Sequence, residues 1–270
     1  MVIGLIFSLI SCSSKESKHS AVTQFELLDV ENNPNIENTR FVINYCFDFL
    51  NEYFAKKPKN VKIYFYQTQK KFQEDLTQIM GTNDRTKNFY EKSGGAPRPR
   101  DNTFLIPNGM SKFSICHEIS HLFIFENYPH FKLPNHIWFE EGLSEYLTHL
   151  AHRIPSPPRY LVIFKQLNLI PASLSRNHYQ WHEQFRTIES KKNIYLQSYL
   201  IIDSLVEKLG RDNFFELIAH SNKDSFENNF KRAVGLYPEE YHQQFIIDLH
   251  LQAAAYYAIQ RKLTPHYRMP

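Results

Sequence analysis

The 270-residue sequence predicts an α+β fold, with a small mixed sheet and several helices in the front half and a helical C-terminal half. Two short front-half segments are typical of strands. Residues 61–67 are β-branched and aromatic, and residues 102–108 contain a short apolar run. The segments around them carry apolar residues at helical spacing. Beyond the Pro-rich stretch at 154–160, helical patterns recur to near the end of the chain.

The boundaries of the predicted elements come from proline, glycine and apolar spacing. Pro58 ends the first helix, and Gly81 is a stop signal for the second. Residues 82–101 are polar and rich in Gly and Pro, so we interpret them as a long loop. The elements expected in the front half are helix 38–57, strand 61–67, helix 69–81, strand 102–108, a helix containing 114–125 and helix 136–150. The helices expected in the back half are 160–168, 195–209, 212–220, 224–234 and 238–260.

The first twelve residues carry no charged side chain. Their apolar run is too short to span a bilayer but has the length of a signal-peptide apolar region. The run ends in Leu-Ile-Ser-Cys at Cys12, which resembles the bacterial lipobox, although no Lys or Arg precedes it. The resemblance implies a signal peptide at 1–12, lipidation of Cys12 and a polar tether at 13–30 that holds a globular domain at a membrane of the bacterial cell envelope. That domain is expected to consist of two subdomains, 31–150 and 151–270.

Charge and cysteine content restrict the other possibilities. The chain has 31 basic and 28 acidic residues, so it lacks the basic footprint of a nucleic-acid-binding protein. Besides Cys12 there are two cysteines, Cys46 and Cys116, and both lie in apolar helical patterns. We expect two buried free thiols, although an envelope protein also permits a disulfide between them.

The stretch SICHEISHLFIF at residues 114–125 places two histidines and a glutamate in an otherwise apolar helix. On an α-helix His117 and His121 lie about 40° apart and about 6 Å along the axis, so both imidazoles face the same side. Glu118 lies in the same polar sector, and apolar residues fill the rest of the circumference. This is the pattern His-Glu-x-x-His, in which the histidines bind zinc and the glutamate is the general base. A catalytic zinc needs a third protein ligand.

The segment WFEEGLSEY at residues 138–146 offers that ligand. Together the two segments resemble the gluzincin metallopeptidases, the superfamily of thermolysin-like and aminopeptidase N-like enzymes. The resemblance implies a zincin-like fold and one zinc ion per chain, held by His117, His121 and Glu141. In that group the third ligand is the glutamate just before a glycine or alanine on the next helix. Spacing and the helical wheel leave Glu140 open as the ligand, whereas the Glu-Gly pairing favours Glu141.

Glu145 follows Glu141 by one helical turn and is positioned to accept the spare ring N–H of His117, which would fix the tautomer of that ligand. Thermolysin-like enzymes place an aspartate at the matching position, so the resemblance supports this role. The alternative is a solvated acidic face.

A donor for the oxyanion of the tetrahedral intermediate is also needed. The run from Tyr195 to Gly210 resembles the helix after the zinc site in aminopeptidase N-like enzymes, in which a tyrosine begins the helix and a glycine ends it. This makes Tyr195 the candidate donor and a catalytic residue, with Tyr199 as a competitor. His178 and His182 are a further alternative, because thermolysin-like enzymes use a histidine in this role.

The function implied is hydrolysis of peptide bonds in a peptide or protein substrate by a lipid-anchored zinc metallopeptidase. In gluzincins an edge strand before the zinc helix binds the substrate backbone, and residues 102–107 are the matching segment. The aminopeptidase signature Gly-x-Met-Glu-Asn is absent, which favours internal cleavage or an unusual substrate. Two alternatives stay open: a non-catalytic zinc-containing binding module of the same fold, and a zinc hydrolase with a non-peptide substrate.

Overall fold

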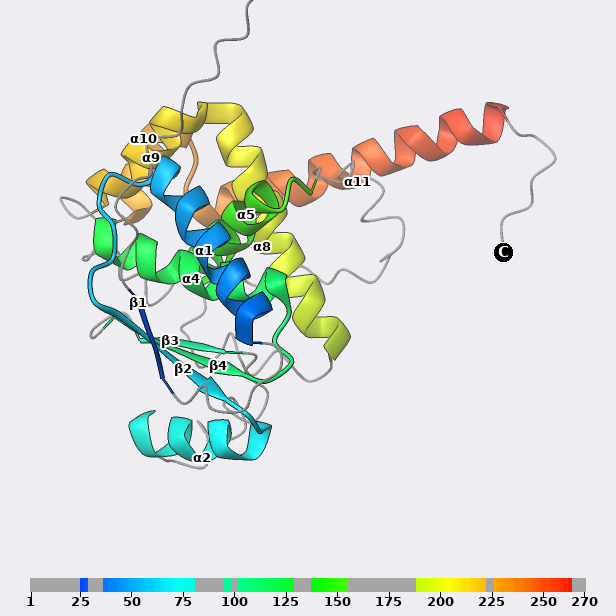
Figure 1. The fold of residues 1–270 in the computed structure, drawn as a ribbon. Helices are drawn as coiled ribbons and strands as arrows, with labels where there is room; N and C mark the ends of the chain where they lie inside the picture. The colour runs from blue at the N-terminus through cyan, green and yellow to red at the C-terminus, as the bar shows by residue number, and fades with distance from the viewer. Residues whose placement is uncertain are drawn as a thin grey trace, which may run out of the picture.

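The computed structural model describes residues 25–28, 36–80, 95–98, 102–128, 137–154, 188–221 and 226–263. Within these ranges the protein is mostly helical, with one small sheet in the front half (Figure 1). The strands are β1 (Phe25–Leu28), β2 (Val61–Tyr66), β3 (Ala96–Arg98) and β4 (Thr103–Pro107). The helices are α1 (Ile36–Tyr53), α2 (Gln69–Met80), α4 (Lys112–Asn127), α5 (Ile137–Ala151), α8 (Ile188–Leu209), α9 (Arg211–His220), α10 (Phe226–Val234) and α11 (Pro238–Leu263).

The sheet is mixed, as expected, with the strand order β1-β2-β4-β3. Strands β1, β2 and β4 are parallel, and β3 runs antiparallel to β4. The register pairs Ile63 with Phe104 and Ala96 with Leu105. The two central strands, β2 and β4, are those that the sequence predicted, because both are apolar enough to be read without their neighbours.

Three expectations about the sheet were wrong. Strand β1 lies in the stretch expected to be a polar tether, and β3 lies inside the stretch expected to be a long loop. Residues 103–107 are not an edge strand, because β4 pairs with β2 on one side and with β3 on the other. Strand β3 has only three residues, Ala-Pro-Arg, so it carries no periodic signal. Its pairing with β4 defines it, and that pairing is a tertiary contact.

The sheet is covered on both faces, and each strand alternates between them. Tyr66 and Leu105 pack with Phe72 and Leu76 of α2 on one face. Residues of opposite parity on β2 and β4 join the main core with α1, α4, α5 and α8; these are Val61, Ile63, Phe65, Phe104 and Ile106. Figure 1 shows α2 on one side of the sheet and α1 and α4 on the other. The arrangement therefore fixes α4 against the sheet.

A disulfide joins Cys46 of α1 to Cys116 of α4, with the two Cα atoms 5.4 Å apart. Both cysteines are fully buried. The expectation of two free thiols was wrong. Helical periodicity puts each cysteine on a buried face, but it does not tell which two helices face each other. The disulfide ties α4 to α1 at the residue that precedes His117.

The helical back half packs onto α5 through α8. Figure 1 shows α11 running out from the body of the molecule toward the C-terminal end. Helix α8 begins at Ile188, about two turns before the expected start, so Tyr195 lies within the helix. The Pro-rich stretch at 154–160, except its first residue, and the helix expected at 160–168 lie outside the described residues. The division into subdomains at residue 150 stays a prediction.

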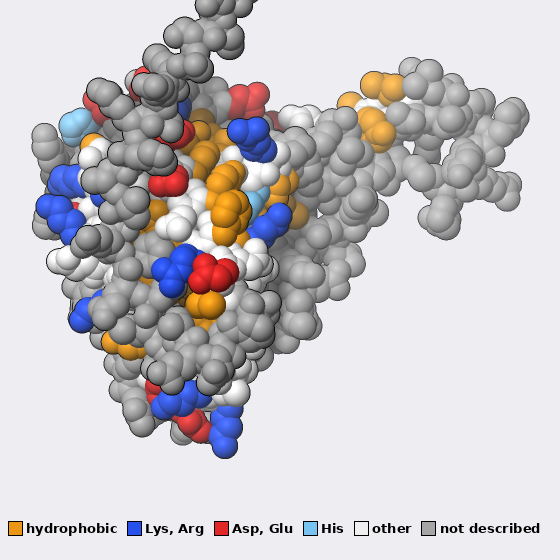
Figure 2. Space-filling model, viewed as in Figure 1, with side chains coloured by type: hydrophobic (Ala, Val, Ile, Leu, Met, Phe, Trp, Pro, Cys, Tyr) orange, Lys and Arg blue, Asp and Glu red, His pale blue; other side chains and the backbone are white. Residues whose placement is uncertain are grey.

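In the described part of the chain, no helix has the length and apolar character needed to cross a membrane. Residues 1–12, for which a signal peptide is expected, lie outside the described residues. Among the described side chains on the face shown in Figure 2, acidic and basic groups are interspersed, and no single sign of charge dominates.

Candidate metal centre

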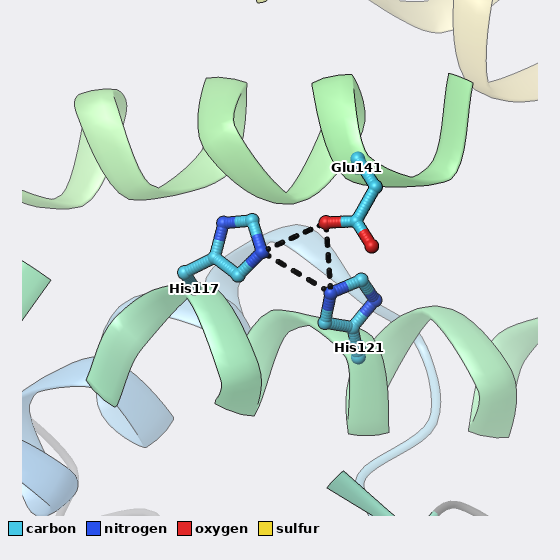
Figure 3. A group of neighbouring side chains, drawn as sticks. All are labelled: His117, His121 and Glu141. Atoms are coloured by element: carbon cyan, nitrogen blue, oxygen red, sulfur yellow. Dashed lines mark hydrogen bonds and ion pairs between the residues drawn. The ribbon is translucent and has the colours of Figure 1, made fainter. Parts of the chain in front are cut away.

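The candidate site forms where two buried helices, α4 and α5, lie alongside each other. Helix α4 begins at an N-cap, Ser111, whose hydroxyl accepts the backbone N–H of Ser114 at 3.0 Å. Nine of its residues are buried, so the helix is enclosed on most sides. Its two histidines face α5, and Figure 3 shows His117 and His121 pointing at Glu141.

The three side chains bring one donor atom each to a common point. Nε2 of His117 lies 3.1 Å from Oε2 of Glu141 and 3.3 Å from Nε2 of His121. The third separation, between Nε2 of His121 and Oε2 of Glu141, is 3.7 Å. Two donors that each lie about 2.0–2.1 Å from a tetrahedral zinc ion are about 3.4 Å apart. The donor set and its spacing therefore fit a zinc ion, and the three residues form a group that can hold a metal.

The structure separates the two neighbouring glutamates that spacing left open. Glu141 faces the Nε2 atoms of both histidines. Glu140 instead lies beside Nδ1 of His121, with its Oε1 at 3.1 Å. The group that can hold a metal contains Glu141 and not Glu140. Sequence reasoning expected Glu145 on the outer side of His117 but missed Glu140 on the outer side of His121, because a helical wheel gives the direction of a side chain but not its partner.

Glu145 and Ser144 occupy the outer side of the two imidazoles. Oε1 of Glu145 lies 3.3 Å from Nδ1 of His117, within ion-pair distance but off the line of a good hydrogen bond. The hydroxyl of Ser144 lies 3.2 Å from Nδ1 of His121. Both outer ring nitrogens thus face oxygen atoms from α5, which leaves both Nε2 atoms for the centre.

The carboxylates around the two histidines favour positive charge on the imidazoles. Burial works to lower the pKa of His117, but its contacts with Glu141 and Glu145 outweigh burial and raise that pKa to about 10. Burial also works to lower the pKa of His121, but the contacts of His121 with Glu140 and Glu141 raise that pKa well above its usual value. Burial would raise the pKa of Glu141, but the two histidines hold it well below its usual range. A cation at the centre would be bound by Glu141, the carboxylate that faces the Nε2 atoms of both imidazoles.

Glu118 and Tyr195, the two predicted catalytic residues, lie beside this group. Glu118 is half-buried on α4, and a Cβ added at Gly95 would lie 3.2 Å from its Cγ, so the backbone at the start of β3 passes close to its side chain. The ring of Tyr195 is 5.8 Å from that of His117, centre to centre. Burial first, and then the charges of Glu141 and Glu118, raise the pKa of the Tyr195 phenol, so its hydroxyl keeps its proton.

The competitors of Tyr195 lie elsewhere or outside the described residues. The ring of Tyr199 stacks on His149 with centroids 4.1 Å apart, one helical turn further along α8. His178 and His182 lie outside the described residues. Of the two tyrosines considered from the sequence, Tyr195 is the one whose ring contacts His117.

Gly142, which follows Glu141, sets the distance between α5 and α8. A Cβ at this position would lie 2.6 Å from the backbone oxygen of Ser198 and 2.9 Å from Cγ1 of Ile202. Only glycine permits this approach without a backbone shift. The close packing of α5 and α8 therefore explains why a glycine follows Glu141. It lets α8 place Tyr195 close to His117.

Comparison with known proteins gives little further information. No family model matches the chain, and no solved structure matches it. The chain is distantly related to YhcO, an uncharacterized protein of Bacillus subtilis, with 28% identity over 110 residues, or 40% of this chain. The match covers 31% of the relative, so the chain spans less than a third of that protein's length. The description of this relative names no activity.

Proposed function

We propose that the protein is a zinc-dependent metallopeptidase of the gluzincin type with a zincin-like fold. The observation that carries this proposal is the convergence of Nε2 of His117, Nε2 of His121 and Oε2 of Glu141 at separations of 3.1–3.7 Å. A structural zinc site is closed by four protein ligands, whereas a site with three protein ligands leaves one position for water or substrate. Glu118, the residue after His117, gives the site a base that a purely structural site does not need.

Each residue has a role that follows from its place. When bound, zinc polarises the scissile carbonyl and lowers the pKa of water, so that a nucleophile forms at neutral pH. Glu118 would take a proton from the attacking water and deliver it to the leaving amine. Tyr195, whose phenol stays protonated, donates its O–H to the developing oxyanion. Glu145 orients His117 through its outer ring nitrogen.

The substrate is proposed to bind along β3. This strand lies at the end of the strand order, pairs with β4 on one side only among the described residues, and packs against α4. An extended peptide added to its other edge would run past Glu118. The short distance between the backbone at Gly95 and the side chain of Glu118 supports this path. The edge strand proposed here therefore replaces residues 102–107, which the sequence had suggested.

The protein is further proposed to be anchored through Cys12 to a membrane of a bacterial cell envelope. The lipobox-like sequence supports the anchor. The disulfide between Cys46 and Cys116 supports an oxidising compartment, since structural disulfides persist there and are rare in the cytosol.

A peptide library tests the activity. The full-length protein, purified in detergent and loaded with zinc, is expected to cleave peptides, to lose cleavage with a chelator and to regain it with zinc. His117→Ala is expected to lose both zinc and cleavage, whereas Glu126→Gln at the far end of α4 is expected to keep both. A zinc-loaded wild type that cleaves no peptide would overturn the peptidase proposal and favour the non-catalytic binding module. A wild type that binds no zinc would overturn the whole proposal.

A further inference from the structure

Two pairs of side chains on helix α5 contact the two histidines. The two members of each pair are one helical turn apart. Glu141 and Glu145 form the first pair, and they contact the inner and outer nitrogens of His117 at 3.1 and 3.3 Å. Glu140 and Ser144 form the second pair. Because residues four apart lie on the same face of a helix, the two pairs run side by side along α5 and match the His117–His121 spacing on α4.

The second pair converges on one atom, Nδ1 of His121. Oε1 of Glu140 is 3.1 Å away and the hydroxyl of Ser144 is 3.2 Å away. Ser144 is fully buried, and the side chain of Glu140 is 20% exposed. A ring nitrogen carries a single N–H, so the two oxygens cannot both be its full acceptors. The charged carboxylate of Glu140 is the stronger acceptor of that N–H.

We propose that Glu140 is a positioning residue of the metal centre, so that each histidine has a carboxylate of its own. This inference rests on the proposed zinc site. With its N–H donated to Glu140, His121 is held in the tautomer whose Nε2 lone pair faces the centre. The carboxylate also makes that nitrogen a more basic donor. Glu140 is therefore not a substitute for Glu141, because it acts from the opposite nitrogen of the ring.

Zinc binding itself is the readout. Glu140→Ala removes both the charge and the acceptor, while Glu140→Gln keeps an acceptor oxygen and removes only the charge. Losing an orienting partner of this kind costs about 10–100-fold in metal affinity. We expect the zinc Kd of the full-length protein, measured by chelator competition, to rise about 10–100-fold in Glu140→Ala and by a smaller factor in Glu140→Gln. Glu126→Gln is the matched control and is expected to leave the Kd unchanged.

Three further measurements separate positioning from a general loss of structure. The zinc dissociation rate is expected to rise in Glu140→Ala, and the visible spectrum of the cobalt-substituted protein is expected to change. The thermal stability of the metal-free protein is expected to stay close to wild type. Wild-type zinc Kd and dissociation rate in Glu140→Ala would overturn the inference. If that variant does not fold, an unchanged Kd in folded Glu140→Gln would overturn it. A wild type that binds no zinc would instead overturn the proposed function.

Discussion

Replacing Gly142 by alanine is expected to damage both the fold and the metal centre. The new Cβ would lie 2.6 Å from the backbone oxygen of Ser198, and ordinary contact begins at 3.4 Å, so α5 and α8 must separate by about 0.8 Å. Backbone atoms cannot turn aside as a flexible side chain can. Overpacking of this kind costs about 1–3 kcal/mol, and the severity here points to the upper end. Alanine returns about 1 kcal/mol through its helix propensity, which leaves a net loss of about 2 kcal/mol.

The effect on the site follows from the same displacement. Functional side chains must be held to within about 0.5 Å, and Glu141 adjoins the displaced residue. We expect Gly142→Ala to lower the melting temperature by roughly 4–8 °C and to weaken zinc binding by at least about tenfold. Differential scanning calorimetry and chelator competition measure the two effects. Ala255→Gly, at an exposed position of α11, isolates the helix-propensity contribution. Wild-type stability and zinc affinity in Gly142→Ala would refute this reasoning.

Three other predictions concern separate parts of the molecule. Removing the disulfide by the double substitution Cys46→Ala and Cys116→Ala should lower the free energy of unfolding by about 4 kcal/mol, because the crosslink closes a loop of 70 residues. Denaturant titration measures this loss, and a loss below about 1 kcal/mol would contradict the prediction. Burial lowers the pKa of His242 to about 4, so the unfolded chain binds the proton more tightly, and stability should fall by at most about 3 kcal/mol as the pH drops from about 6.5 to 4. His242→Leu should flatten that part of the pH–stability curve, and an unchanged slope would exclude His242 as its cause. Gly95→Ala would bring a Cβ to 2.6 Å from Cε of Met110 and 3.2 Å from Cγ of Glu118, so it should displace Glu118 and lower kcat about tenfold with zinc content unchanged; an unaffected kcat would contradict this prediction.

Much of the candidate metal centre could be predicted from the sequence because its signal is local. His117, Glu118 and His121 lie on one helix, and the helical repeat fixes their relative directions. The helix that carries Glu141 could also be predicted, because its apolar residues recur at helical spacing. The choice between Glu140 and Glu141 was different. It depends on how α5 is rotated against α4, and that rotation is set by packing, including the close approach of Gly142 to Ser198.

The features that the sequence did not reveal are long-range pairings. Strand β3 has no pattern of its own, and only its pairing with β4 makes it the edge strand beside Glu118. The disulfide depends on α1 and α4 facing each other across 70 residues of sequence. In both cases the local signal, a Gly-Pro-rich segment or a buried cysteine, is compatible with several partners. A fold is needed to choose among them.

The central claim, that Glu118 is the base of a zinc peptidase, is tested most directly by comparing Glu118→Gln with the wild type at equal zinc content. Glutamine keeps the size of the side chain and removes its ability to take a proton. General-base catalysis contributes about 10²–10⁴-fold. We expect the zinc-loaded variant to bind the metal as the wild type does and to cleave its best library peptide with a kcat lower by about that factor. A Glu118→Gln variant that holds one zinc and cleaves at the wild-type rate would contradict the claim.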